Sequence, residues 1–565
     1  LELQTDVIRK NFSHKTAVER EKFWNTKSYL YRVAPSFAYT NDQEPRLIAD
    51  AYNAKLFTTG LLLNSEVNFH KLLAQVKDSV MLEKYNRLDL LRKEIDACYQ
   101  LPVTERAERV KAAEAEAESL EKQLVKGCKA YGDFMSNLKV DYKTVASQLG
   151  DKDVAIEFVN FEMANRGTTY VALLLRKGWD VPLMKVLFSQ SQLDTLNYTH
   201  GNFTSVMRAQ HDINQVYADK RLTNLVWAPI LRACPDVKNI YFSPCGLLYQ
   251  LAIEYLPLTD SCCVSDRYNC YRLSSTATAG LTHEARPITK AAIYGGINYE
   301  TDLTTLQTLH NTHEWQQAMD YITDVEDVDL ALTDEADQML TRAGFHYLPG
   351  TKVEAETIGE ILMQNDVTTL MRTDDYATEE SFKALGGQDF SLLHIATHGF
   401  YFTPDDIKHS STARAILQES GGEDQSMSYA GLLLAGATTA LKTPNFPREL
   451  EDGILTAREI SLLDFRQLDL VVLSACKTGV GEVKEDGVFG LQRAFKKAGA
   501  KTLVMSLWSV NDAATEQMMT SFYAHLSEGL PKHEAFRRAQ NELRQHPSFS
   551  SPSCWAAFIM LDSQD

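Results

Sequence analysis

Two stretches of sequence decide the predicted fold: His394–Phe400, HIATHGF, and Asp469–Gly481, DLVVLSACKTGVG. In each, a short apolar run stops at a reactive side chain beside small residues, His398 followed by Gly399 in the first and Cys476 in the second. Such a run, bounded by turn-forming residues, is typical of a buried strand in a parallel sheet. Because open α/β sheets place their chemistry at the carboxyl ends of the strands, we expect His398 and Cys476 to meet at one edge.

A thiol beside an imidazole at such an edge is typical of cysteine peptidases. In this interpretation Cys476 is the nucleophile, and His398 takes up its proton and returns it to the leaving amine. The backbone N–H groups of Gly399 and Cys476 would face the oxygen of the tetrahedral intermediate, and a glycine at 399 lets the substrate carbonyl approach closely. A lone histidine or cysteine at a strand end more often serves packing or hydrogen bonding. The residues alone therefore leave both interpretations open.

Composition and charge narrow the class of protein. At 565 residues the chain is too long for a single core. A net charge of -18 argues against nucleic-acid and anionic-membrane binding, and no apolar run reaches the roughly 18 to 20 residues of a membrane span. The nine cysteines are odd in number and lack the spacing of a disulfide framework or a zinc site. We therefore expect a reducing, cytoplasmic compartment and neither metal nor cofactor.

The pattern of apolar residues divides the chain into three predicted parts. Residues 1–150 are predicted to be helical, with a charged helix pair from about Val80 to Tyr131. Residues 151–287 are rich in predicted strands, including the apolar run Leu247–Leu256. Residues 288–565 alternate strands with helices, which predicts a mainly parallel sheet with helices on both faces.

Residues 240–565 resemble the CHAT domain, a caspase-like cysteine peptidase domain that is related to separase and often follows tetratricopeptide repeats. The blocks that carry this resemblance are Tyr241–Glu254, Ile293–Tyr299, His394–Phe400, Leu432–Ala437, Glu451–Glu459, Val471–Gly481, Gly487–Ala500, Met505–Thr515 and Cys554–Phe558. The resemblance implies a caspase-like α/β fold and a catalytic dyad of His398 and Cys476. It also implies that 151–287 is a supporting or pseudo-caspase half, and that 1–150 ends a repeat array.

The resemblance also suggests what the substrate pocket prefers. Family members such as separase cut after a basic residue, so an acid downstream of Cys476 is expected to bind an Arg or Lys side chain. Asp512 is the candidate for this acid, with Trp508 as a wall of the pocket and Asn298 as a further lining residue. The sequence S-V-N-D-A-A-T-E equally supports Asp512 as the cap of a helix that starts near Ala513, so both roles stay open.

Other chemistries have weaker support in the sequence. Glu482 and Asp486 are rival acids in the loop after the cysteine. His394 and His398 are four residues apart but lack the glutamate of a zinc-binding helix motif. Gly479-Val480-Gly481 lacks the third glycine and the downstream acid of a dinucleotide site.

The expected partners are proteins. A peptidase of this kind acts on a protein substrate, and the helical region 1–150 is expected to bind a regulatory protein or ligand. Such binding would order the loops around Cys476, including the polar segment Asp405–Ser426. The alternative is a catalytically silent scaffold that keeps the fold for protein interaction, and the presence of both dyad residues counts against it.

Overall fold

The computed structural model describes most of the chain. The described residues are 1–59, 72–73, 78–99, 103–128, 141–163, 167–281, 286–311, 345–402, 425–443, 446–447, 449–475, 478–479, 482–484 and 487–565. The predicted nucleophile Cys476 and most of the segment Asp405–Ser426 lie outside these residues.

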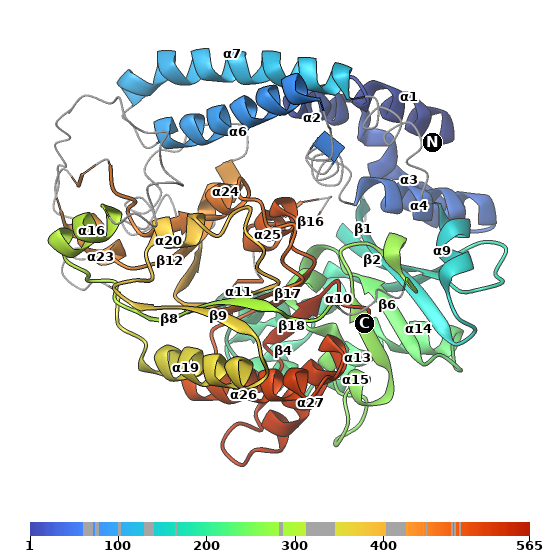
Figure 1. Ribbon diagram of the computed structural model, residues 1–565. Coiled ribbons are helices and arrows are strands. Elements are labelled where there is room, and N and C mark those ends of the chain that lie inside the picture. The colour runs from blue at the N-terminus through green and yellow to red at the C-terminus, as the bar shows by residue number, and fades with distance from the viewer. Residues whose placement is uncertain are drawn as a thin grey trace.

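The N-terminal region is helical, as predicted. Its helices are α1 (Glu2–Phe12), α2 (Ala17–Lys27), α3 (Tyr29–Thr40), α4 (Pro45–Thr58), α6 (Ser79–Tyr99), α7 (Val103–Gly127) and α9 (Tyr142–Gln148). α6 and α7 lie side by side (Figure 1), and Leu88, Leu91, Leu124 and Val125 from the two helices are buried in one apolar cluster. The predicted charged helix pair is therefore present. In the described part of the chain, no helix is both long and apolar enough to cross a lipid bilayer.

An eleven-stranded sheet forms the centre of the molecule. In spatial order, its strands are β3 (Leu183–Ser189), β2 (Gly167–Leu175), β1 (Asp153–Met163), β6 (Asn239–Ser243), β7 (Asn269–Arg272), β18 (Phe558–Leu561), β17 (Thr502–Ser506), β14 (Leu470–Ala475), β10 (Leu392–Thr397), β8 (Lys290–Ile297) and β9 (Thr368–Asp374). β10 and β14, the strands predicted from the two decisive stretches, lie next to each other and are buried along their whole length.

The sheet consists of two parallel blocks that run in opposite directions. β17, β14, β10, β8 and β9 are parallel to one another, and so are β1, β6, β7 and β18. The blocks meet where β17 pairs with β18 in the antiparallel sense, and β2 and β3 add an antiparallel edge. The predicted mainly parallel α/β sheet is therefore confirmed. Residues 151–287 contribute strands to this same sheet, and their assignment as a separate domain stays a prediction.

Helices cover both faces of the block that contains β10 and β14 (Figure 1). On one side lie α19 (Pro349–Gln364), α26 (Asp512–Ser527) and α27 (Lys532–Gln545), and on the other α20 (Glu379–Lys383), α24 (Ala457–Ile460) and α25 (Leu491–Ala498). A small antiparallel sheet follows β10 and consists of β11 (Gly399–Tyr401), β12 (Ala430–Leu433) and β13 (Ile454–Thr456).

Shorter described elements connect these parts. They are α10 (Gln190–Leu193), β4 (Asn197–Tyr198), β5 (Gly201–Asn202), α11 (Phe203–Ala209), α12 (Ile213–Val216), α13 (Lys220–Val226), α14 (Ala228–Ala233), η1 (Gly246–Gln250), η2 (Ile253–Tyr255), α15 (Val264–Arg267), η3 (Thr276–Thr278), α16 (Leu303–His310), η4 (Gln425–Tyr429), α23 (Ala437–Lys442), β15 (Glu482–Lys484), β16 (Gly487–Phe489) and α28 (Pro552–Trp555).

The predicted strand within Leu247–Leu256 is wrong, because this apolar run forms the two short 3₁₀ helices η1 and η2. Side chains satisfy its backbone in place of a neighbouring strand. The Tyr217 hydroxyl accepts the Ala252 N–H at 2.9 Å, and the Trp227 indole N–H donates to the Ile253 carbonyl at 2.7 Å. A short buried apolar run does not by itself distinguish a strand from such a segment.

A glycine lets α19 lie very close to β8. A Cβ atom at Gly295 would stand 2.4 Å from the Thr351 carbonyl oxygen and 2.7 Å from the Ala355 Cβ. The Thr351 hydroxyl also accepts the N–H of Gly296 at 3.0 Å. These contacts set the position of the first turns of α19 against the sheet.

We expect Gly295→Ala to lower the free energy of unfolding by about 1 to 3 kcal/mol, because the added methyl group meets backbone that has no room to move. Urea denaturation followed by circular dichroism measures this change. An unchanged unfolding midpoint would show that β8 and α19 are not packed as closely as described.

Candidate active site

β10 and β14 bring the predicted catalytic positions to one edge of the sheet. The strands pair in parallel, with Thr397 opposite Ala475. Each of these residues is the last of its strand, so His398 and residue 476 leave the sheet at the same level, on strands about 4.8 Å apart. Cys476 itself lies outside the described residues, and its pairing with His398 stays a prediction.

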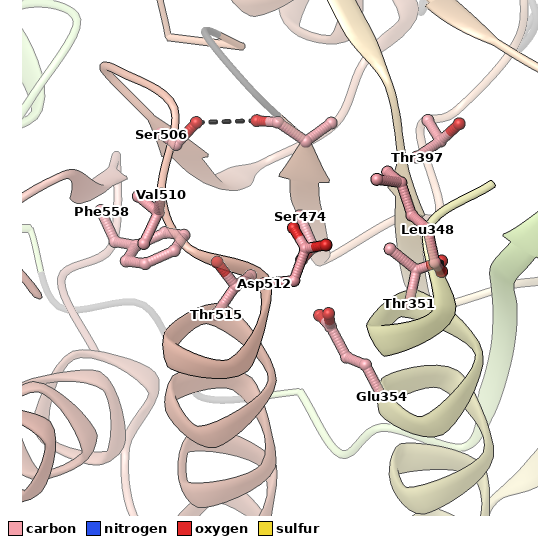
Figure 2. Close-up of a pocket in the computed structure, with 11 residues that line it drawn as sticks. Leu348, Thr351, Glu354, Thr397, Ser474, Ser506, Val510, Asp512, Thr515 and Phe558 are labelled. Carbon is pink, nitrogen blue, oxygen red and sulfur yellow. Dashed lines mark hydrogen bonds between the residues drawn. The ribbon is translucent and has the colours of Figure 1, made fainter. Parts of the chain in front are cut away.

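The backbone on both sides of Cys476 is tied to β17. Ser506 Oγ donates to the Ala475 carbonyl at 2.7 Å (Figure 2). After the cysteine, Thr478 Oγ1 accepts the Ser506 N–H at 3.1 Å, and the Gly479 N–H donates to the Ser506 carbonyl at 2.8 Å. Ser506, which sequence analysis did not single out, therefore holds the two ends of the segment that carries the thiol.

A backbone carbonyl orients the ring of His398. Nε2 donates to the His346 carbonyl oxygen at 2.8 Å, since a carbonyl can only accept. In a neutral imidazole this leaves Nδ1 as the acceptor, the role required of a base that takes a proton from a thiol. The Tyr299 ring lies 5.1 Å from that of His398, and its hydroxyl accepts the His398 backbone N–H at 3.3 Å. Burial raises the pKa of Tyr299 to about 12, so this hydroxyl stays protonated.

Gly399 directs its backbone N–H away from the small sheet. It begins β11 and lies opposite Leu432 of β12, while the Leu433 N–H donates to the His398 carbonyl at 3.0 Å. That bond makes Gly399 and Leu432 a non-hydrogen-bonded pair, whose N–H groups point outward from the ladder. The orientation is compatible with the predicted oxyanion role of Gly399 and Cys476, which stays a prediction.

A pocket of about 410 Å³, including its open mouth, lies at these strand ends. It is lined by Leu348, Thr351, Glu354, Thr397, Ser474, Ala475, Ser506, Val510, Asp512, Thr515 and Phe558. Figure 2 shows these residues around the space between α19 and α26. Because Thr397 and Ala475 directly precede His398 and Cys476, the pocket adjoins the predicted dyad.

Asp512 faces this pocket from the first turn of α26. The cap of that helix is Asn511, whose side-chain oxygen accepts the N–H groups of Ala513 at 3.1 Å and Ala514 at 3.3 Å. Asp512 is therefore free of the capping role that the sequence also allowed. Burial is the main cause of the raised pKa of Tyr299, and the negative charge of Asp512 adds to it.

Trp508 and Asn298 contact residues outside the pocket, and their predicted roles in substrate binding stay predictions. Trp508 is buried, its indole N–H donates to the Ser553 carbonyl at 2.9 Å, and its ring lies 5.5 Å from that of Tyr217. Asn298 donates to Asp375 Oδ1 at 2.7 Å in the turn after β8. Within the described residues, neither side chain lines the pocket.

The remaining candidates of the sequence do not come together with the pocket in the described part of the chain. Asp486 and the side chain of Glu482 lie outside the described residues. His394 is fully buried between Glu354 and Tyr523, whereas His398 contacts Tyr299 and the His346 carbonyl. The two histidines share none of these partners.

An acidic cluster around Lys383 supports the small sheet that follows His398. The Lys383 ammonium lies 2.8 Å from Glu379, 2.8 Å from Glu451 and 2.9 Å from Glu459. Oxygens of these three carboxylates lie within 4.8 Å of one another, a spacing that would suit a metal ion. The ammonium group already supplies the cation at this point, so the geometry is that of a structural charge cluster.

Backbone hydrogen bonds connect the Lys383 cluster to His398. Glu379 accepts the Gly453 N–H at 2.9 Å, and the Gly453 carbonyl accepts the Leu434 N–H at 2.7 Å. Its neighbour Leu433 bonds to the His398 carbonyl. Asp452 lies in the same segment, and its pKa is raised to about 7 by burial and by the charge of Glu459.

Comparison with known families gives a match over more than half of the chain. A family model described as the CHAT domain matches residues 218–563. Tetratricopeptide repeat protein 28 of mouse is 37% identical over 115 residues, and that of human is 36% identical over 114 residues. Each match covers 20% of this chain and 5% of the relative, so the chain spans only a small part of those proteins.

Solved structures show a distant likeness. The Arg-specific cysteine proteinase gingipain R aligns over 65% of this chain and 68% of its own, with 8% identity and a TM-score of 0.33. A separase–securin complex of Saccharomyces cerevisiae aligns over 90% of this chain and 40% of its own, with 8% identity and a TM-score of 0.36. At these scores the likeness adds nothing to the sheet topology described above.

The Lys383 cluster makes stability depend on pH through Asp452. A carboxyl whose pKa rises on folding contributes stability below its ordinary pKa of 3.8, and this contribution is lost as the pH rises through about 7. Asp452→Asn removes the ionisation, so the difference in melting temperature, variant minus wild type, should become steadily more positive from about pH 4 to about pH 7 and then level off. Asp42→Asn, at an exposed position, is the matched control. A constant difference for Asp452→Asn would contradict the raised pKa.

Proposed function

The chain belongs to the CHAT-domain family, and from that premise we propose that it is a cysteine endopeptidase with Cys476 as nucleophile and His398 as base and acid. The observation that carries the proposal is the parallel pairing of Thr397 with Ala475, which brings the positions that follow them to one edge of the sheet. The pocket beside this edge is the proposed binding site of a substrate side chain.

The proposed reaction uses the orientation of the imidazole. Nδ1 of His398 takes the thiol proton, because Nε2 already donates to the His346 carbonyl. The thiolate attacks the carbon of the scissile carbonyl, and the N–H groups of Gly399 and Cys476 bind the resulting oxyanion. The imidazolium then protonates the leaving amine, and water hydrolyses the acyl-enzyme.

We propose that the substrate carries a basic residue on the acyl side of the scissile bond. Asp512 lies in the pocket wall, and no lysine or arginine is present among the described lining residues. A carboxylate in a partly walled pocket binds a guanidinium or ammonium group by charge-assisted hydrogen bonds.

We further propose that a protein or ligand bound to the N-terminal helices controls the peptidase. Apolar side chains on α1 and α3 are exposed, with Leu3 at 80%, Tyr29 at 64% and Phe37 at 56%. α3 and α4 in turn contact the sheet: the Tyr39 ring lies 5.5 Å from that of Phe161 on β1, and Tyr52 is buried there. A partner on the exposed surface is therefore one helix layer away from the sheet.

The peptidase proposal is tested with fluorogenic peptides that end in Arg, Lys or Asp. We expect cleavage after Arg or Lys, none after Asp, and a loss of at least about a thousandfold in kcat/KM for Cys476→Ala, because the nucleophile is removed. Cys554→Ala, which changes a half-buried cysteine of α28, is the matched control and should keep full activity. Cleavage that survives Cys476→Ala, or no cleavage by the wild type, would leave the silent scaffold as the better description.

Control by the N-terminal region is tested by comparing the full chain with a chain that lacks residues 1–150. If these helices hold the loops around Cys476, the two chains should differ severalfold in kcat/KM for the same peptide. Melting curves establish that the shortened chain is folded. Equal rates would refute the proposed control and leave the peptidase proposal intact.

A further inference from the structure

A second acid, Glu354, lies deeper in the substrate pocket than Asp512. Asp512 is exposed at the start of α26, whereas Glu354 is 1% exposed and comes from the second turn of α19. Figure 2 shows the two side chains on facing helices around the same space, which Ser474 also lines. The pocket thus has one carboxylate at its rim and another at its base.

The buried side chains of His394 and Tyr523 lie next to Glu354 on the side away from the pocket mouth. His394 Nε2 lies 3.2 Å from Glu354 Oε1, and the Tyr523 hydroxyl lies 3.2 Å from His394 Nδ1. Burial, with a smaller effect of the Glu354 charge, raises the pKa of Tyr523 far above its ordinary value, so the phenol stays protonated beside Nδ1. Nε2 is the ring nitrogen of His394 that faces the carboxylate.

The pocket also contains buried acceptors without a hydrogen-bond partner. Among the described residues, Ser474 Oγ, Glu354 Oε1 and His394 Nε2 have no hydrogen-bond partner, although Nε2 lies 3.2 Å from Oε1. Buried polar atoms without partners are rare in folded proteins, since each loses its bonds to water. Ser474 and Glu354 line the same pocket, which indicates that a bound group supplies the missing donors.

A guanidinium group matches this set of acceptors better than an ammonium group does. Its five N–H donors lie in one plane and point in several directions, whereas the shorter lysine side chain ends in a compact charge with three donors. A guanidinium can therefore contact the rim carboxylate of Asp512 and reach Ser474 and Glu354 at the base. Two carboxylates without a basic neighbour in the described lining also favour a permanently charged cation.

We propose that Glu354 is a second specificity-determining residue of the proposed peptidase, that it selects arginine over lysine, and that His394 is its positioning residue. This inference rests on the proposed function for its meaning as substrate choice. Asp512 attracts either basic side chain at the rim, and Glu354 with Ser474 recognises the guanidinium at the base.

The test compares kcat/KM for peptides that differ only in a terminal Arg or Lys. We expect Glu354→Gln to lower the Arg-to-Lys preference by about tenfold or more, because a charge-assisted bond is lost at the base of the pocket. Asp512→Asn should lower both rates together. Glu360→Gln, an exposed change on the same helix, should leave both unchanged. Glu354→Asp keeps the negative charge on a shorter side chain and should give an intermediate Arg-to-Lys preference. It serves as the test variant if Glu354→Gln does not fold. An unchanged Arg-to-Lys ratio in a folded variant would overturn the inference.

A binding measurement separates this inference from the peptidase proposal. Calorimetry on the full chain with Cys476→Ala compares agmatine, which carries a guanidinium and an ammonium, with cadaverine, which has the same charge but carries two ammonium groups. We expect agmatine to bind more tightly than cadaverine and to lose about tenfold in affinity with Glu354→Gln added. That result without peptide cleavage would sink the proposed function and keep the guanidinium site. Absence of agmatine binding, or equal binding of the two amines, would refute the site even in an active peptidase.

Discussion

The parallel pairing of β10 with β14 is the constraint on which the candidate site depends. Thr397 stands opposite Ala475 in the interior of the five-stranded parallel block, which helices cover on both faces, and both strands are buried along their whole length. A slip of one residue would turn the side chains of a strand to the opposite face and would separate His398 from the level of residue 476. Ser506 and the backbone bonds from Gly453 to Leu433 then hold the segments that leave the two strands.

Sequence reasoning located the parts of the site that have a pattern of their own. Short apolar runs that stop at His398 and before Cys476 predicted β10 and β14, and their place in an alternating series predicted the parallel sheet. The orienting group of His398 is a backbone carbonyl, which any residue at 346 would supply, so no side chain marks it. Glu354 stands in an ordinary helical sequence, and only the approach of α19 to α26 places it opposite Asp512. The expectation that Trp508 forms a wall of the substrate pocket came from the family resemblance and stays a prediction; its ring lies 5.5 Å from that of Tyr217.

Two groups of buried acids in this molecule differ in how their charge is balanced. Around Lys383, one ammonium lies within ion-pair distance of three glutamates, and the group ties loops to the sheet. In the pocket, the Glu354 carboxylate lies 3.2 Å from the His394 ring, and no lysine or arginine is present among the described lining residues. A buried carboxylate without a balancing charge is costly. The pocket therefore favours binding of a cation, whereas the Lys383 cluster already contains one.

The position of β18 has a consequence for the order in which the molecule is made. β18 joins the two parallel blocks, and its first residue, Phe558, pairs with Ser506 and forms part of the pocket wall. All the other strands of the large sheet are translated before it. A ribosome-bound chain that has not yet released residues 558–561 therefore has a split sheet and an open-sided pocket, because the strand at the seam is still missing. The pocket of the nascent chain is therefore completed only when β18 joins the two parallel blocks of the sheet.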